Sequence, residues 1–285
     1  MGLINPAGFN SDYYTYYYDM YIGVSGRRQW MLQDIENAPV TSNVQFDYVW
    51  KERDRPRLLT GGYILQDQAG RMGTTGIYGR LAGFIGDPID QGALSAGISL
   101  GYVQYRIRPV GSQPLQNGDP LLSFNQSQWV PDVGLGIHYC RELGQANNFF
   151  YAGLSIPQIL ALDLTFKNDN NTFSLLRSPH FYGVIGYYKT LRDFSFFEPS
   201  VWVRYVAGTP LSIDFNFRFQ PIEVFWVGAG IDTAANLHFE FGLRLGSSSE
   251  RPFKIAYAVD RGVNGYGPFF GYSHEVHIGF YLSNY

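Results

Sequence analysis

The stretch Leu211-Ser212-Ile213-Asp214-Phe215-Asn216-Phe217-Arg218-Phe219-Gln220 decides how this chain folds. Large apolar side chains occupy every odd position of the stretch, and polar or charged side chains occupy every even position. Successive side chains of a β-strand point to opposite faces, so this period of two predicts a strand with one apolar and one polar face.

The same alternation recurs in residues 40–50, 94–102, 133–139 and 237–245. Gly, Ser, Asn and Tyr dominate the polar face of these segments, and Lys and Glu are scarce on it. A soluble β-sandwich would turn a charged face toward water. The observed faces instead suit a transmembrane barrel, with an apolar exterior against lipid and a polar lumen.

Composition points the same way and excludes several classes of protein. Charged residues make up 16% of the 285 residues, against about 25% in an ordinary soluble domain. The formal net charge of −3 does not suit a nucleic-acid-binding protein, which presents a basic patch. The single cysteine, Cys140, cannot build a disulfide framework or a cysteine metal site.

Fourteen segments carry the alternation, each close to the roughly 10 residues that a tilted membrane strand needs. The number is even, as in single-chain bacterial barrels. We therefore predict an all-β, antiparallel, up-and-down transmembrane β-barrel of about fourteen strands. The predicted strands are residues 18–30, 40–50, 58–66, 74–85, 93–105, 130–141, 148–156, 180–189, 197–206, 210–220, 223–232, 236–246, 253–260 and 273–282.

The three long gaps between these segments, residues 106–129, 157–179 and 261–272, all follow odd-numbered strands. They should therefore open on the same rim of the barrel. Outer-membrane barrels carry long loops outside and short turns in the periplasm, so we expect both termini in the periplasm. No charged and apolar leader opens the chain, and we expect the signal peptide to have been removed.

The sequence divides into an N-terminal lead, residues 1–17, and a barrel, residues 18–285. The lead is aromatic near its end, so we expect it to lie in the periplasm or to pack into the barrel. Trp30, Trp50 and Trp129 stand at predicted strand ends, where aromatic girdles meet the membrane interface. Trp202 and Trp226 fall mid-strand on the polar face, which predicts packing in the lumen.

Short motifs follow one another along the chain in a particular order. They are Asn5-Pro6-Ala7, Arg28-Gln29-Trp30, Asp67-Gln68-Ala69-Gly70, Glu198-Pro199-Ser200 and Ser273-His274-Glu275. Their order resembles the PorP/SprF family of outer-membrane proteins of the Bacteroidetes type IX secretion system. The resemblance spans essentially the whole chain, and its most specific elements are the first, second and last of these motifs.

The resemblance implies a non-enzymatic role in protein secretion. Members of the family anchor or help export surface proteins, including gliding adhesins, by engaging a C-terminal sorting domain. Others associate with peptidoglycan-linked periplasmic components of the same machinery. The implied partners are therefore a secreted protein or adhesin, other type IX secretion components and outer-membrane lipid, and no cofactor is implied.

Catalytic and metal sites find little support in the sequence. The five histidines are His138, His180, His238, His274 and His277, and no metal-binding or nucleophile motif surrounds any of them. Cys140 shares a face with His138, but nothing supplies an orienting third residue. Hydrolases of the outer membrane place Ser, His and Asn on the lipid-facing side, whereas the polar side chains here fall on the opposite face. We therefore predict no catalytic residue, no metal ligand and no enzymatic activity.

Charged side chains on the predicted lumen face offer a candidate docking site. One interpretation is a network of ion pairs that neutralises the interior, because buried charges must be paired. The other is a surface that binds a partner segment, for which the planar arginine fork is well suited. The candidate residues are Arg80, Arg204, Asp214, Arg218, Glu240 and Arg244.

Glycines on the same face also allow two interpretations, since a glycine in a strand marks either a bend or the close approach of another backbone. They either curve the strands or make room for an inserted N-terminal segment or partner chain. They are Gly97, Gly101, Gly134, Gly136, Gly228, Gly230, Gly242 and Gly279.

Taken together, the residues and the resemblance predict an outer-membrane barrel that docks a secreted surface protein or links to periplasmic machinery. The alternative function is a passive, porin-like channel, since about fourteen strands lie between filled eight-stranded barrels and open sixteen-stranded porins. A lumenal or rim hydrolase using His138 or His274 is a third and less favoured possibility.

Overall fold

A computed structural model describes residues 5–8, 18–31, 38–53, 55–87, 92–107, 126–144, 148–168, 171–192, 195–246, 253–265 and 267–282. Nearly all of them lie in strands. The elements are β1 Met20–Arg28, β2 Val40–Glu52, β3 Arg55–Ala69, β4 Met72–Asp87, β5 Gly92–Ile107, β6 Gln126–Glu142, β7 Phe149–Gln158, β8 Leu162–Asn168, β9 Asn171–Arg177, β10 His180–Arg192, β11 Ser195–Val206, β12 Ser212–Ile222, β13 Phe225–Asp232, β14 Asn236–Leu245, β15 Phe253–Gly262, α1 Gly267–Phe270 and β16 Tyr272–Leu282.

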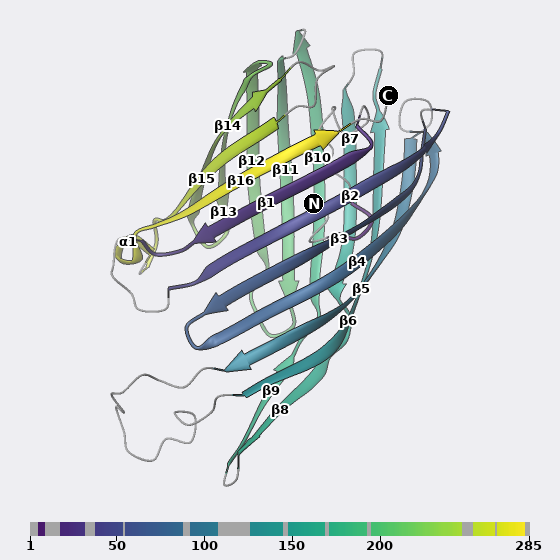
Figure 1. The fold of residues 1–285 in the computed structure, drawn as a ribbon. Coiled ribbons are helices and arrows are strands. Elements are labelled where there is room, and N and C mark those ends of the chain that lie inside the picture. The colour runs from purple at the N-terminus through teal and green to yellow at the C-terminus, as the bar shows by residue number, and fades with distance from the viewer. Residues whose placement is uncertain are drawn as a thin grey trace.

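Fourteen of the described strands form one closed antiparallel barrel, in which each strand pairs with its neighbour along the chain and β10 follows β7 (Figure 1). β16 pairs with β1 and closes the barrel, with Gly279 opposite Gly23. A closed barrel leaves no unpaired edge, which is the condition for crossing lipid with strands. The predicted fold class and strand number are confirmed.

Connections at one end of the barrel are longer than those at the other. We call the end that carries the β1–β2, β5–β6, β7–β10 and β15–β16 connections the long-loop rim, and the opposite end, where β16 finishes, the short-turn rim. The strands on either side of each predicted gap meet the gap at the long-loop rim, and residues 108–125 of the first gap lie outside the described part of the chain. Within the described residues, no helix is long and apolar enough to span a membrane.

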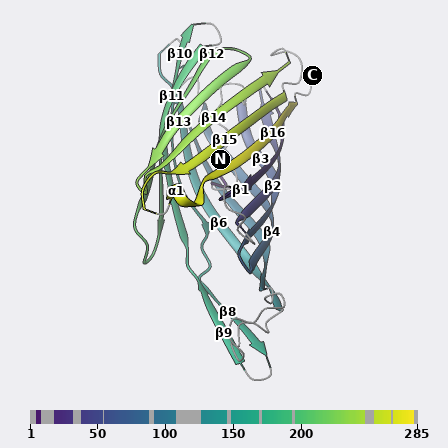
Figure 2. The same ribbon diagram turned by 90° about the vertical axis from the view of Figure 1, so that its left-hand side faces the viewer.

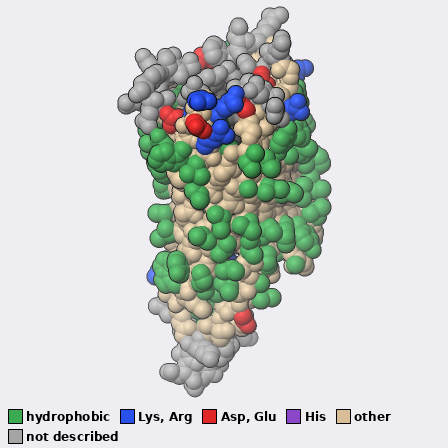
Figure 3. All heavy atoms as spheres, turned by 90° about the vertical axis from the view of Figure 1, so that its right-hand side faces the viewer, with side chains coloured by type: hydrophobic (Ala, Val, Ile, Leu, Met, Phe, Trp, Pro, Cys, Tyr) green, Lys and Arg blue, Asp and Glu red, His purple; other side chains and the backbone are tan. Residues whose placement is uncertain are grey.

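The apolar faces of the strands point outward, as the alternation predicts. In β12, Phe215 and Phe217 are 45% and 52% exposed, and in β5 Leu100 is 57% exposed. Their neighbours on the opposite face, such as Ser99 and Asp132, are almost completely buried. Figure 3 shows apolar side chains spread over one side of the wall, with most of the visible charged side chains near one rim.

The connection at residues 157–179 was predicted as a loop, and most of it is instead a β-hairpin. β8 and β9 pair with each other only and project from the long-loop rim beyond the barrel wall (Figure 2). Leu164 and Phe166 of β8 are buried against Tyr63 and Tyr78, whose side chains face inward. The hairpin therefore packs on the inner side of the rim formed by β3–β6. A single helical turn, α1, lies in the last of the three predicted gaps, residues 261–272.

Candidate binding cavity at the barrel mouth

The first described residues of the chain, Asn5, Pro6, Ala7 and Gly8, are buried inside the barrel. We call them the N-terminal tetrad. The Asn5 side-chain amide donates a hydrogen bond to the Ile137 carbonyl of β6 at 3.0 Å, and the Ser95 hydroxyl of β5 donates to the Ala7 carbonyl at 2.9 Å. These bonds fix the tetrad against the inner wall. The aromatic residues 13–17 of the lead lie outside the described part of the chain.

Two of the predicted lumen glycines make room for this tetrad. A Cβ on Gly97 would lie 2.7 Å from the Ala7 nitrogen, and one on Gly136 would lie 2.0 Å from Asn5 Oδ1. Both distances are shorter than real Cβ atoms tolerate. At these two positions, the inserted N-terminal segment is therefore the reason for glycine. Elsewhere the glycines accommodate side chains of neighbouring strands, as Gly242 does for the Trp226 ring.

Arg80 of β4 connects the tetrad to the barrel. Its guanidinium donates to the Gly8 carbonyl at 2.8 Å and forms a two-pronged ion pair with Asp47 of β2, with both N–O distances at 2.6 Å. The two side chains are 1% and 8% exposed. Arg80 thus lies on the predicted lumen face, but its donors are already committed within the chain.

A second group of paired residues anchors the β8–β9 hairpin. Arg177 of β9 forms an ion pair with Asp132 of β6, and both side chains are buried. The Tyr78 hydroxyl donates to the same carboxylate at 2.7 Å. The hairpin base and the tetrad therefore fill the lumen along one wall of the barrel, the wall formed by β4–β7 and their neighbouring strands.

A large cavity lies at the long-loop rim against the remaining wall. Its volume is about 960 Å³, near the upper end of the range found for ligand pockets. We call it the mouth cavity. It is lined by Arg27, Gln29, Trp30, Thr41, Asp67, Tyr182, Trp202, Arg204, Asp214, Asn216, Asp232, Asn236, His238, Asp260, Gly262, Gly267, Phe270, Gly271 and Ser273.

The charges that line the mouth cavity do not balance. Two arginines face four aspartates, which leaves a surplus of two carboxylates when His238 is neutral. Arg204 pairs with Asp214 at 3.0 Å, and Arg27 pairs with Asp260. The surplus carboxylates are Asp67, which accepts a hydrogen bond from the Thr41 hydroxyl at 2.5 Å, and Asp232.

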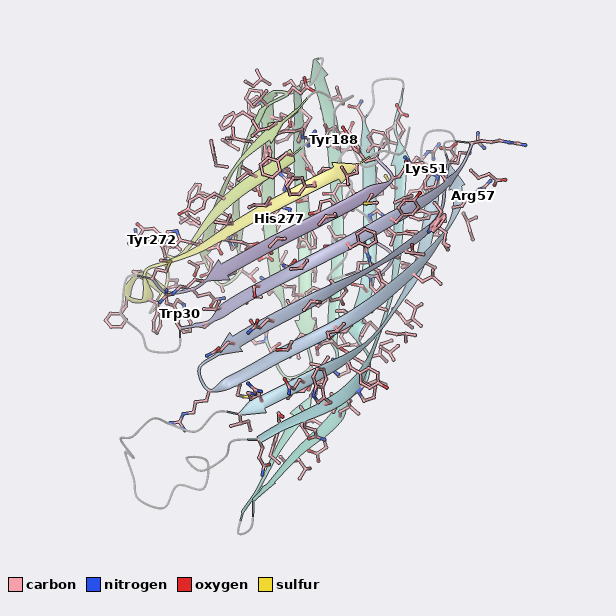
Figure 4. All side chains as sticks on the ribbon, in the orientation of Figure 1. Trp30, Lys51, Arg57, Tyr188, Tyr272 and His277 are labelled. Carbon is pink, nitrogen blue, oxygen red and sulfur yellow. The ribbon has the colours of Figure 1, made fainter. Side chains whose placement is uncertain are left out.

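Aromatic side chains form the lip of the mouth cavity. Trp30 follows β1, and its ring stacks on Phe270 of α1, with a centroid distance of 4.9 Å. Trp30 has φ 59°, a conformation that is uncommon for a bulky residue. Figure 4 shows Trp30 and Tyr272 at the end of the barrel that carries α1, and Lys51 and Arg57 at the opposite end.

The girdle interpretation is therefore wrong for Trp30, because the turn after β1 directs its ring to the cavity. Trp50 and Trp129, 53% and 51% exposed, stand on the outer face near opposite rims, as a girdle requires. Trp202 lines the mouth cavity, and Trp226 is 2% exposed on the inner face. Both positions agree with the predicted packing in the lumen.

Two motifs that are far apart in the sequence meet beside this cavity. β1 and β16 are neighbours, and Arg28 lies opposite His274 in their register. The Met31 N–H donates to the Tyr272 carbonyl at 2.9 Å, which continues the pairing past β1. Gln29, Trp30 and Ser273 line the cavity, and Glu275 lies 3.5 Å from Arg27.

A smaller cavity of about 290 Å³ lies deeper in the lumen. Trp202, Asn216 and His238 line both cavities, so the two adjoin. Arg218 lies beside the smaller cavity and pairs with Glu240 at 2.5 Å and with Glu198 at 3.2 Å.

The six predicted docking residues thus occupy different places. Arg204 and Asp214 line the mouth cavity, with Arg204 46% exposed. Arg218 and Glu240 line the smaller cavity. Arg80 is occupied by the tetrad, and Arg244 is buried and lines neither cavity.

Several members of these networks were not singled out from the sequence. Arg27 and Asp260 occupy the inner face of predicted strands, so the alternation could have identified them, and Glu198 was named only as part of a motif. Arg177 lies in a segment that was predicted as a loop. No pattern in the sequence identified it.

The histidines do not assemble a catalytic group within the described part of the chain. His138 is 2% exposed, and Cys140 belongs to a buried cluster with Tyr151 and Tyr188. His274 corrects the expectation that polar side chains avoid the outer face, because it lies outside, 2.5 Å from the Tyr257 hydroxyl.

One possible metal-binding group is present, formed by Asp214, Asp232 and His238. Its members are already engaged. Asp232 accepts hydrogen bonds from the Ala234 and Asn236 backbones at 2.9 Å each, and His238 Nδ1 lies 2.8 Å from Asp260. The Asp232 bonds shape the β13–β14 turn. Together with the His238–Asp260 contact, they explain why these side chains lie close together without a metal ion.

Comparison with known proteins gives one family and a common architecture. The model of the family described as type IX secretion system membrane protein PorP/SprF matches residues 1–280. No curated protein matches the chain. Among solved structures, the TodX monoaromatic hydrocarbon channel (deltaS2 mutant) is similar with a TM-score of 0.50 and 9% identity, covering 92% of this chain and 88% of that one. The beta domain of the Bordetella autotransporter BrkA is similar with a TM-score of 0.45 and 12% identity, covering 93% and 99%. At 9% identity, the similarity to TodX shows the barrel fold alone.

Proposed function

We propose that this chain, which belongs to the type IX secretion system membrane protein family PorP/SprF, is a non-enzymatic outer-membrane barrel that docks a secreted surface protein. The docked part is the C-terminal domain of that protein, such as an adhesin. Docking takes place at the long-loop rim. No turnover chemistry is required, because the role of the site is to hold a partner.

The mouth cavity carries this proposal. It combines accessible charge, aromatic rings and about 960 Å³ of space at a single rim. Buried aromatic and arginine side chains within a cavity are the usual centres of binding energy at protein interfaces. Residues of the Arg28-Gln29-Trp30 and Ser273-His274-Glu275 motifs meet there, so the features that tie the chain to its family coincide with the cavity.

The orientation of the barrel follows from its connections. Outer-membrane barrels place long loops outside and short turns in the periplasm. The long-loop rim, with the mouth cavity, then faces the cell exterior, where a surface protein is held. The short-turn rim and both termini face the periplasm, where other secretion components and peptidoglycan-linked proteins are reached.

Co-purification from native membranes tests the docking role. We expect a secreted protein with a C-terminal sorting domain to remain bound to the barrel and to be identified by mass spectrometry. Trp30→Ala should lower its recovery about tenfold, because a buried tryptophan at an interface commonly contributes that much affinity. The matched control, Trp50→Ala, removes a tryptophan from the outer face near the other rim and should leave recovery unchanged.

Two results would contradict this role. Equal recovery with Trp30→Ala and Trp50→Ala would contradict docking at the mouth cavity. Absence of any sorting-domain protein from the wild-type complex would contradict docking altogether.

A passive channel is the rival function, favoured by the adjoining cavities that share Trp202, Asn216 and His238. Because the tetrad and the buried ion pairs occupy the other wall, we expect the purified barrel to pass no steady open-channel current in a planar lipid bilayer. A steady, ohmic current from single barrels would favour the porin function over docking.

A further inference from the structure

We propose that the mouth cavity binds a cationic side chain, Arg or Lys, presented by the polypeptide that docks there. The inference rests on the proposed docking function and gives it a chemical requirement: the partner must carry a positive group on the segment that enters the barrel. The surplus of carboxylates, the aromatic lip and the size of the cavity each support it.

The charge surplus sets the sign of the ligand. Asp214 lies opposite Asp232 in the register of β12 and β13, and like charges placed directly across a strand pair repel each other. Arg204 pairs with Asp214 at 3.0 Å, whereas Asp232 accepts hydrogen bonds from backbone N–H groups of the β13–β14 turn and lies 3.9 Å from His238 Nε2. An incoming cation would relieve this repulsion. With His238 neutral, an incoming anion would meet two carboxylates that neither arginine of the cavity pairs with.

Asp67 adds a second attractive centre. It projects into the same cavity from β3, and its carboxylate accepts a hydrogen bond from a neutral hydroxyl, that of Thr41 at 2.5 Å. A carboxylate with a neutral partner retains its full charge for a ligand. Charge-assisted hydrogen bonds to a guanidinium or ammonium are about twice as strong as neutral ones.

The aromatic rings select a cation that has an organic stem. Trp30 and Phe270 stack at the lip, and Tyr182 and Trp202 line the cavity. Cations bind over tryptophan and tyrosine faces, most often as arginine, and the methylene stem of Arg or Lys packs on apolar surface. A hydrated metal ion would gain nothing from these rings, whereas an organic cation would pack against them.

The test uses the whole barrel, purified in a zwitterionic detergent, and capped peptides as probes. The cationic probe is Gly-Arg-Gly-Arg-Gly, and the matched neutral probe replaces each Arg with citrulline, which has the same shape. Binding is followed by intrinsic tryptophan fluorescence and by calorimetry. We expect the arginine peptide to bind at least about tenfold more tightly than the citrulline peptide, with an affinity that falls as salt is raised.

Two variants with opposite predicted effects make the test specific. Asp67→Asn keeps an acceptor for Thr41 and removes one charge, so it should weaken the arginine peptide about threefold, the size expected for a partly exposed ion pair. Arg204→Gln removes a competing cation and should strengthen binding by a similar factor. Asp87→Asn, which removes a carboxylate paired with Arg55 at the short-turn rim, should change nothing.

Equal affinity for the arginine and citrulline peptides would overturn the inference, and so would weaker binding after Arg204→Gln. Saturable binding of calcium chloride in place of the peptide would also overturn it and would assign the carboxylates to a metal. The outcome is separate from the docking test. If the arginine peptide binds with the predicted pattern and no sorting-domain protein co-purifies, the proposed function fails while the cation-binding cavity remains.

Discussion

Replacing Arg80 with methionine is expected to lower the free energy of unfolding by about 3–5 kcal/mol, the usual cost of removing one partner from a buried ion pair. Methionine keeps much of the volume but leaves the Asp47 carboxylate, 8% exposed, without its two-pronged partner. It also removes the donor to the Gly8 carbonyl at 2.8 Å. Equilibrium urea unfolding in lipid vesicles measures the loss.

The double variant Asp47→Leu/Arg80→Met separates the two contributions. Replacing a whole buried ion pair with apolar side chains is often neutral or stabilising, so most of the loss should be recovered. The part that remains reports the contacts to the N-terminal tetrad. If the double variant is as unstable as Arg80→Met alone, the cost does not come from the unpaired carboxylate, and the ion-pair explanation fails.

The barrel itself could be predicted because lipid and lumen impose opposite chemistry on alternate residues. In β12 every outward side chain from Ile213 to Phe219 is apolar, and every inward one is polar. A one-residue slip would reverse both faces, so the pattern fixes the register as well as the strand. For this reason all fourteen predicted segments coincide with barrel strands.

The β8–β9 hairpin shows where that pattern stops being informative. Leu162, Leu164 and Phe166 alternate with polar residues just as barrel strands do, but their apolar side packs on the inner wall instead of facing lipid. Alternation reports two unlike faces and does not identify what covers the apolar one.

The sequence predicts which charged residues face the lumen, but it does not predict which of them a partner can reach. The alternation places Arg80, Arg204 and Arg218 on the lumen side, and the structure agrees. Which of them a partner can reach depends on where residues 5–8 lie, and they cover Arg80 and leave Arg204 at the mouth. No periodicity encodes the position of a chain end inside a barrel. The inward turn of Trp30 likewise depends on a single positive φ angle.

Replacing Phe217 with arginine is expected to cost about 2–4 kcal/mol of folding free energy, the range for a cation at the bilayer midplane on the lipid side of a barrel. Phe217 lies at the centre of β12 and is 52% exposed on the outer face. Because the strand backbone is fully paired, the side chain cannot withdraw into the wall. Urea unfolding of the barrel in phosphocholine vesicles gives the difference from the wild-type protein.

Two further arginine variants in or beside β12 test whether the cost depends on depth in the bilayer and on which face of the strand carries the arginine. Leu211, which precedes β12, is 50% exposed on the outer face at the long-loop rim, and Leu211→Arg should cost only about 0–1 kcal/mol because the rim lies near the interface. Asn216 adjoins Phe217 but lines the two cavities, where water solvates an added guanidinium, so Asn216→Arg should cost much less than Phe217→Arg. Equal costs for Phe217→Arg and Asn216→Arg would mean that the two faces meet the same medium, which no membrane barrel allows. Equal costs for Phe217→Arg and Leu211→Arg would mean that the outer face of β12 does not cross a bilayer.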